Sequence, residues 1–263
     1  MTMTVSLQAV VAFWAAHLGC SEAQLAQPTT SVVRNGPELA SDRGATVVSC
    51  PPACVLAVPA DWYAPVASRI RPRPPAEVFD GTLLRQLFGV GVDRVIGPAW
   101  LGDADSSDLR PAPTRGSRLL SDQDLAELQR LAAACGPRAW AHSGIDPARP
   151  PLFGCFVGDR LVAAGMLERW GDRLLHVGIV THPGYRGRGY GKAVVSAMSA
   201  HGLATGGVLQ YRTLQANLAS VGIARGAGLP ALRPDSGRAA HPARLTVGSA
   251  GGASVGAARM SAR

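Results

Sequence analysis

The segment that most constrains the fold is residues 179–192, which read IVTHPGYRGRGYGK. An apolar strand runs into Thr181, a tight loop with alternate glycines follows, and a helix begins near Lys192. Glycines let backbone amides turn inward and approach an oxyanion closely. The following helix directs its positive end at the same point, and Arg186 and Arg188 add charge. The segment therefore predicts a phosphate or diphosphate site between a strand and a helix.

Two common nucleotide-binding loops do not fit this segment. A Walker A loop requires glycine at position 186 and serine or threonine at position 193, where the chain has Arg186 and Ala193. A dinucleotide fingerprint requires Gly-x-Gly-x-x-Gly within a parallel βαβ unit. Here the spacing is Gly-x-Gly-x-Gly, and the preceding strands read as an antiparallel meander.

Apolar runs separated by turn residues predict the elements around the loop. The turns are Gly158-Asp159 and Gly171-Asp172, and a helix begins at a capping box of Ser121 and Asp124 and ends at Gly136-Pro137. The predicted strands are 152–157, 161–169, 174–181 and 207–213, and the later helices are about 190–202 and 216–227. This pattern predicts an α/β fold with a mixed, mainly antiparallel sheet flanked by helices.

Residues 1–115 are less clearly patterned and predict an N-terminal α/β extension. Met1 to Gly19 reads as an amphipathic helix, because it lacks the basic start of a signal peptide and is too short to span a bilayer. The other expected elements are two short strands within 46–59, a helix at 81–89, a strand at 93–99 and a linker or exposed loop at 102–117.

Composition limits the classes of partner. The net charge is +8, but no dense basic run appears, so we expect dispersed surface arginines and no nucleic-acid partner. The cysteine count of 5 is odd, and Cys50 and Cys54 have no second pair at ligand spacing, so we expect neither a disulfide framework nor a metal site. With no membrane segment predicted, we expect a cytoplasmic protein.

The glycine loop resembles the acetyl-CoA loop of the GNAT superfamily of N-acetyltransferases. The family motif is Arg/Gln-x-x-Gly-x-Gly/Ala, matched by Arg186, Gly189 and Gly191. The resemblance extends over about residues 118–230, and we take 118–232 as the GNAT domain.

Residues 212–229 resemble the later strand and helix of that family. Asn217, Ser220 and Gly228 fit its pattern, and Leu229 stands where phenylalanine is usual. Ala224 stands where the family often has a tyrosine that protonates the leaving thiolate, so another group or solvent must supply that proton.

The resemblance implies transfer of acetyl from acetyl-CoA to a primary amine of a small molecule. In the family, a splayed strand pairs with the pantetheine arm and the loop amides hold the diphosphate. Candidate bases are Glu168 and His176, with a solvated strand residue and a half-buried core imidazole as the alternatives; Tyr211 reads as a packed strand residue. The expected cofactor-binding residues are Ile179, Val180, Thr181, Arg186, Gly187, Arg188, Gly189, Tyr190, Gly191, Lys192, Asn217 and Ser220.

Several alternatives stay open at this point. Detoxification of an aminoglycoside-type antibiotic is one specific version of the small-molecule reaction. Acetylation of protein N-termini or lysines, and a non-catalytic acyl-CoA-binding regulatory module, are the others. A homodimer is compatible with each of them, and none requires a membrane.

The C-terminal tail departs from the family. Residues 230–233 read Pro-Ala-Leu-Arg, and one codon choice read one base over gives Gln-Arg-Tyr-Gly, which suggests a frame-shifted tail. We expect residues 233–263 to be mostly disordered, with one short strand at 244–247.

Overall fold

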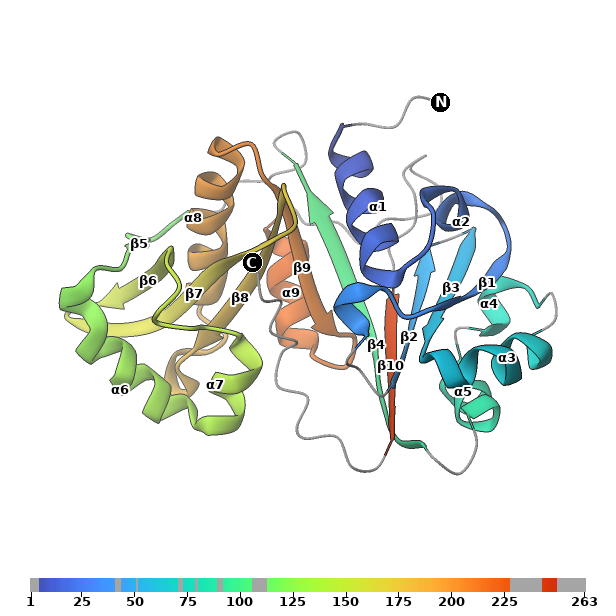
Figure 1. Cartoon of the computed structure of the whole chain (residues 1–263). Helices are drawn as coiled ribbons and strands as arrows, with labels where there is room; N and C mark the ends of the chain where they lie inside the picture. Colours follow the sequence, from blue (N-terminus) through green and yellow to red (C-terminus); the bar gives the residue numbers. More distant parts are fainter. Residues whose placement is uncertain are drawn as a thin grey trace. The chain divides into compact units, whose positions relative to one another are not determined.

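The structure is a computed structural model of the 263-residue chain. It describes residues 5–40, 44–50, 52–70, 73–78, 80–88, 92–105, 113–227 and 243–249. The chain divides into two compact units, the first holding residues up to Leu101 together with 213–216 and the last strand, and the second holding most of the rest (Figure 1). The domain boundaries expected from the sequence stay predictions.

The first unit is a five-strand sheet with helices around it. Its strands run in the order β1-β3-β2-β10-β4, with β1 and β3 parallel and the other neighbouring pairs antiparallel. Its elements are α1 (Val5–Leu18), α2 (Glu22–Ala26), β1 (Thr30–Arg34), η1 (Pro37–Leu39), β2 (Gly44–Cys50), β3 (Ala53–Val58), α3 (Ala60–Arg69), α4 (Pro75–Val78), α5 (Gly81–Phe88), β4 (Val92–Ala104) and β10 (Ala243–Ser249).

Most of the elements expected in this unit are confirmed. The pair of strands within 46–59, the helix at 81–89, the strand at 93–99 and the late strand at 244–247 all form. The prediction of a linker or exposed loop at 102–117 is wrong for its first residues, because β4 continues to Ala104. Residues 106–112 of that segment lie outside the described residues.

The N-terminal segment forms a helix as expected, but α1 is less amphipathic than predicted. Its buried residues include Trp14 and Leu18, whereas the exposed positions Gln8, Ala12 and Ala16 are mostly small rather than charged. Within the described residues, no helix combines the length and apolarity that crossing a bilayer requires.

The second unit contains the glycine loop. Its strands run in the order β9-β8-β7-β6-β5, antiparallel except for the parallel pair of β8 and β9. Its elements are β5 (Arg118–Leu119), η3 (Asp122–Asp124), α6 (Leu125–Cys135), α7 (Pro137–Ser143), β6 (Leu152–Val157), β7 (Arg160–Trp170), β8 (Leu174–Thr181), η4 (Pro183–Tyr185), α8 (Tyr190–Ala204), β9 (Val208–Leu214) and α9 (Leu218–Gly226). This confirms the expected mixed, mainly antiparallel sheet flanked by helices.

Two details of this unit were not expected. The capping box of Ser121 and Asp124 is present, but it opens a 3-10 turn before α6 begins at Leu125. After α6 ends at Cys135, as expected, Pro137 starts a further short helix, α7, for which no element had been predicted. Proline at the first helical position lacks only an N–H that a helix start leaves unpaired in any case.

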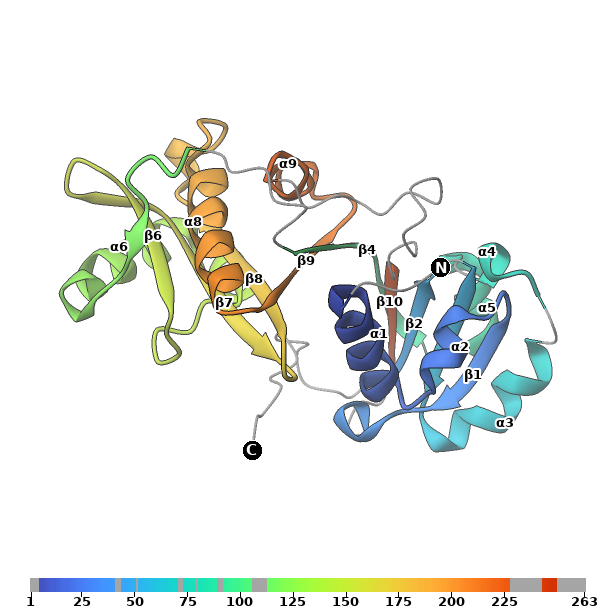
Figure 2. The ribbon, with the colours of Figure 1, turned by 90° about the horizontal axis from the view of Figure 1, so that it is seen from above.

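Different helices, α8 and α6, cover the two faces of this sheet (Figure 2). Gly165 on β7 lies against Met198 of α8, and Gly202 of α8 lies against Leu175 of β8. The neighbouring residue Met166 instead joins the core that includes Leu128 and Leu131 of α6. Since successive strand residues point to opposite faces, α8 covers one face and α6 covers the other.

Gly178 sets how closely α7 approaches β8. A Cβ built on Gly178 would lie nearer to the carbonyl oxygen of Ser143 than real Cβ atoms approach any atom. Ser143 is the last residue of α7, and its backbone cannot move without shifting the helix.

We predict that Gly178→Ala lowers the free energy of unfolding by about 1–3 kcal/mol, as overpacking does. Gly222→Ala is the control, since Gly222 lies inside α9 with no atom within 4 Å of its Cβ position. There alanine should stabilise by about 0.5–1 kcal/mol. Chemical denaturation of both variants measures this, and equal stability of Gly178→Ala and the wild type would contradict it.

Candidate functional site

The glycine loop joins β8 to α8 through two left-handed residues. After the η4 turn, Gly187 has φ +75° and Gly189 has φ +85°, and Gly189 is the N-cap of α8. L-residues rarely adopt this conformation, since their Cβ then approaches the backbone too closely. The glycines at these two positions are therefore required by the backbone conformation of the loop.

The amides of residues 187–192 remain available at this helix start. Within the described part of the chain, no carbonyl accepts a hydrogen bond from them; the first intrahelical bond is from the Ala193 amide to the Gly189 carbonyl, at 3.0 Å. The first amides of any helix lack intrahelical partners. Together with the positive end of the helix dipole, they have the properties that an anion site requires.

Gly191 has a different role from the two left-handed glycines. Its Cβ position lies 2.9 Å from Thr181 Oγ1 and 3.0 Å from Ile223 Cδ1. The start of α8 therefore packs closely against the end of β8 and against α9, where a larger side chain would separate them.

Cationic side chains surround the loop. Arg186 Nε donates to the Thr181 carbonyl at 3.3 Å, Arg188 lies over the Tyr185 ring at 5.5 Å, and the Lys192 ammonium lies 3.0 Å from the Cβ position of Gly226. Within the described residues, no carboxylate forms an ion pair with any of these cations. The loop therefore combines unpaired amides with unpaired positive charge.

The structure adds Arg115, which sequence reasoning missed. Its Nη1 donates to the Arg188 carbonyl at 3.0 Å, and its guanidinium carbon lies 5.8 Å from the centre of the Tyr190 ring. Arg115 belongs to the segment expected to be a linker, and no motif connects it with the loop. Only the pairing of β5 with β6 brings it there.

The strands next to the loop diverge. The parallel register of β8 and β9 ends at His176 opposite Gln210, while β8 continues in register with β7 as far as Thr181 opposite Ala163. One edge of residues 177–181 therefore has no strand partner in the described register. The expected pantetheine-binding residues Ile179, Val180 and Thr181 lie on this edge, and their role stays a prediction.

Glu168 and His176 are direct neighbours across β7 and β8. Glu168 Oε2 accepts a hydrogen bond from Trp170 Nε1 at 3.1 Å, and Glu168 Oε1 lies 3.5 Å from Arg149 Nη1. His176 is the last residue of β8 in register with β9, so this pair lies beside the point where the strands diverge.

His176 is held as a neutral ring. It stacks on Trp170 with ring centres 4.3 Å apart, and its Nδ1 is buried without a hydrogen-bond partner among the described residues. Burial, with the nearby charge of Arg212, lowers the pKa of His176 to about 3. A group this weakly basic binds a proton poorly at neutral pH.

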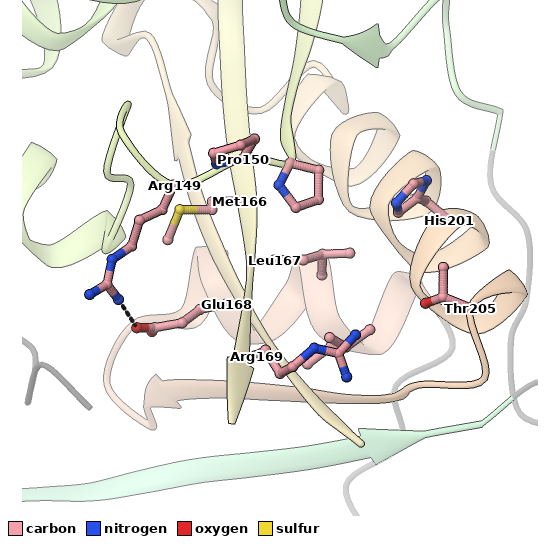
Figure 3. A pocket seen from close by; sticks show the side chains of 10 residues that line it. Arg149, Pro150, Met166, Leu167, Glu168, Arg169, His201 and Thr205 are labelled. Atoms are coloured by element: carbon pink, nitrogen blue, oxygen red, sulfur yellow. Dashed lines mark hydrogen bonds and ion pairs between the residues drawn. The ribbon is translucent and has the colours of Figure 1, made fainter. Parts of the chain in front are cut away.

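Glu168 also borders a cavity of about 370 Å³ (Figure 3). The cavity lies between residues 149–151, the β7 segment 166–169, and His201 and Thr205 near the end of α8. A volume of this size accommodates a small molecule. Glu168 therefore lines the cavity and also lies opposite His176, the residue at which the pairing of β8 with β9 ends.

The residues expected on α9 are engaged in local contacts. Asn217 Oδ1 caps α9 by accepting from the Ser220 amide at 3.2 Å, and Ser220 Oγ lies 2.9 Å from the hydroxyl of Tyr211. Burial raises the pKa of Tyr211.

Ala224 is fully buried, and Gly228 and Leu229 lie outside the described residues. A cofactor contact of Asn217 or Ser220 stays a prediction.

Comparison with known proteins identifies this segment. Residues 119–229 match the model of the acetyltransferase (GNAT) family. No curated protein matches the chain.

Solved structures with a similar trace include GNAT-family proteins. One from Novosphingobium aromaticivorans is 24% identical, with a TM-score of 0.44, over 60% of this chain and 66% of its own. One from Colwellia psychrerythraea is 18% identical, with a TM-score of 0.47, over 64% of this chain and 61% of its own. An aminoglycoside acetyltransferase from an uncultured soil metagenomic sample is 11% identical, with a TM-score of 0.33, over 49% of this chain and 91% of its own. The alignment with this chain thus covers less than two thirds of the length of each of the first two proteins.

We predict that His176 makes the stability of the protein depend on pH. Its folded pKa of about 3 lies below the ordinary value of 6.5, so the unfolded state binds the proton first as pH falls. Its contribution is fully present above pH 6.5 and is lost on acidification, by about 2 kcal/mol between pH 7 and pH 5.

His176→Phe retains a ring against Trp170 but removes the titrating group. The unfolding free energy of this variant, measured by chemical denaturation, should fall by about 2 kcal/mol less than that of the wild type between pH 7 and pH 5. Identical pH profiles for the two proteins would mean that His176 titrates normally.

Proposed function

Residues 119–229 form a domain of the acetyltransferase (GNAT) family, and from this premise we propose that the chain transfers an acetyl group from acetyl-CoA to a primary amine of a small molecule. The observation that carries the proposal is the coincidence of free amides and unpaired cations at the start of α8. A diphosphate needs both, because its oxygens accept hydrogen bonds and carry negative charge.

The open edge of β8 is suited to bind the pantetheine arm of acetyl-CoA. Pantetheine is an extended chain with amide groups, and an unpaired strand edge offers backbone groups for such a chain to pair with. Ile179, Val180 and Thr181 lie between the point of divergence and the loop. We propose that the diphosphate binds the amides of residues 187–192, which extends the thioester toward His176 and Glu168.

In the proposed reaction, the amine nitrogen attacks the thioester carbonyl. A carbon–nitrogen bond forms and the carbon–sulfur bond breaks, the amine loses one proton, and the departing thiolate takes up one. A backbone N–H at the diverging strand would stabilise the developing oxyanion.

We assign the proton-accepting role to Glu168, directly or through a water molecule. Its side chain borders the cavity and remains partly accessible, at 20% exposure. The low pKa of His176 argues against that ring as the base. We propose instead that His176 holds Trp170 in place beside Glu168, and that solvent protonates the thiolate.

The charge of the cavity lining indicates which kind of acceptor amine it suits. The cavity is lined by residues that include Arg149 and Arg169 as well as Glu168, so its charge is mixed and does not favour a polycation. An aminoglycoside-type acceptor, and with it a role in antibiotic resistance, is therefore the less favoured version of the proposal. A cytoplasmic location, the lack of nucleic-acid and membrane partners, and a homodimer stay predictions from the sequence.

We predict that Gly189→Val abolishes measurable binding of coenzyme A. A β-branched residue resists the left-handed conformation that directs the amides inward. Gly206→Val is the matched control: Gly206 has φ +74°, has no atom within 4 Å of its Cβ position, and follows the C-terminal end of α8.

Both variants should be destabilised to a similar extent, but only Gly189→Val should lose the heat of association with coenzyme A in calorimetry. If the wild-type protein itself gives no such heat, the proposed function fails. If the two variants bound coenzyme A with equal affinity, the loop would not be part of the coenzyme A site.

We further predict that the purified protein releases free thiol from acetyl-CoA in the presence of small amines. Glu168→Gln should reduce kcat/KM by about 100-fold, the scale of a lost general base, while the affinity for coenzyme A stays unchanged. Glu22→Gln, in the first unit, is the control. Turnover with peptides alone would favour a protein acetyltransferase, and tight coenzyme A binding without any turnover would favour a regulatory module.

A further inference from the structure

Arg115 lies at the glycine loop although it is distant from that loop in the sequence. Its turn immediately precedes the edge strand β5, and Ser117 donates to the Thr114 carbonyl across the turn at 2.8 Å. β5 pairs with β6 through Arg118 opposite Gly154, and Cys155 Sγ lies 3.6 Å from the Arg115 carbonyl. The sheet therefore fixes the position of this turn beside α8.

The guanidinium group of Arg115 lies against the helix start itself. Its carbon and its Nη2 are each 3.8 Å from the Cβ position of Gly189, which is the N-cap of α8. Its Nη1 bonds the Arg188 carbonyl, leaving the other N–H groups of the fork for further acceptors.

This position is electrostatically unfavourable without an anion. A cation next to the positive end of a helix is repelled, and Arg186, Arg188 and Lys192 add charge of the same sign. Within the described residues, no carboxylate pairs with Arg115, whereas the nearby Arg118 is paired to Asp124 at 2.7 Å. A ligand with several negative charges would convert this repulsion into attraction.

The backbone of Arg115 is also unusual. It is the only non-glycine residue with positive φ among the described residues, at +49°, and Gly116 follows at +73°. A turn with two left-handed central residues normally carries asparagine, aspartate or glycine at these positions. The turn would therefore accept glycine in place of Arg115 without strain.

We propose that Arg115 is a phosphate-binding residue for the acetyl donor. It would reach the glycine loop from the turn before the edge strand β5. This inference rests on the proposed function. Because the guanidinium lies beside Gly189, where the amides of α8 begin, we assign it to the diphosphate of coenzyme A rather than to the 3′-phosphate. Arg115 then holds the donor from the turn before β5, next to the motif residue Gly189.

Calorimetry with coenzyme A and with 3′-dephospho-coenzyme A tests the proposal on the full chain. Arg115→Gly suits the turn conformation, so its thermal midpoint without ligand should equal or exceed that of the wild type. Its affinity should nevertheless fall at least tenfold, and by the same factor for both ligands, since both contain the diphosphate. Arg115→Lys should recover part of the loss, because it restores the charge without the fork.

Arg138→Met is the control for net charge, since Arg138 is an exposed residue of α7 in the same unit. It should bind both ligands as the wild type does. If Arg115→Gly binds both ligands with unchanged affinity, the proposal is wrong while the proposed function stands. A loss confined to coenzyme A would overturn the assignment to the diphosphate. A wild-type protein that binds neither ligand would refute the proposed function itself.

Discussion

The unpaired amides at the start of α8 are the constraint on which the site depends. A helix start always leaves donors without intrahelical acceptors. In most helices a capping side chain or water takes them, but here the N-cap is Gly189, which has no side chain to offer. Left-handed backbone at Gly187 and Gly189 leads the chain from the η4 turn into α8, and the amides of residues 187–192 have no carbonyl acceptor among the described residues. The proposed anion binding thus depends on the absence of a capping side chain at Gly189 as well as on the cations around the loop.

The sheet supplies the geometry that turns this anion site into a candidate transferase site. β8 is held along its whole length by β7, so it stays extended as far as the loop. It pairs with β9 only from Leu174 to His176, and beyond that point one edge is open. A rigid strand with one open edge that ends at an anion site suits a ligand with an extended arm and a charged head. Glu168, on the neighbouring strand, brings a carboxylate to the start of the open edge.

Much of the second unit could be predicted from local pattern. The strands at 152–157, 161–169 and 174–181 are short apolar runs separated by glycine–aspartate turns, and such pairs specify hairpins through neighbouring residues alone. The glycine loop is equally local. A prediction failed where distant partners decide structure: β4 extends to Ala104 past the glycine and aspartate that suggested a linker.

The sequence by itself determined the glycine loop and the meander of strands, because each depends on residues within a few positions of one another. Only the tertiary structure decided which side chains meet around them. It brought Arg115 to Gly189 through the pairing of β5 with β6, and it packed the His176 ring on Trp170 in surroundings that lower the pKa of the ring. These contacts join residues on different elements, and their distances and burial depend on how the whole sheet and its helices pack, which no local spacing encodes.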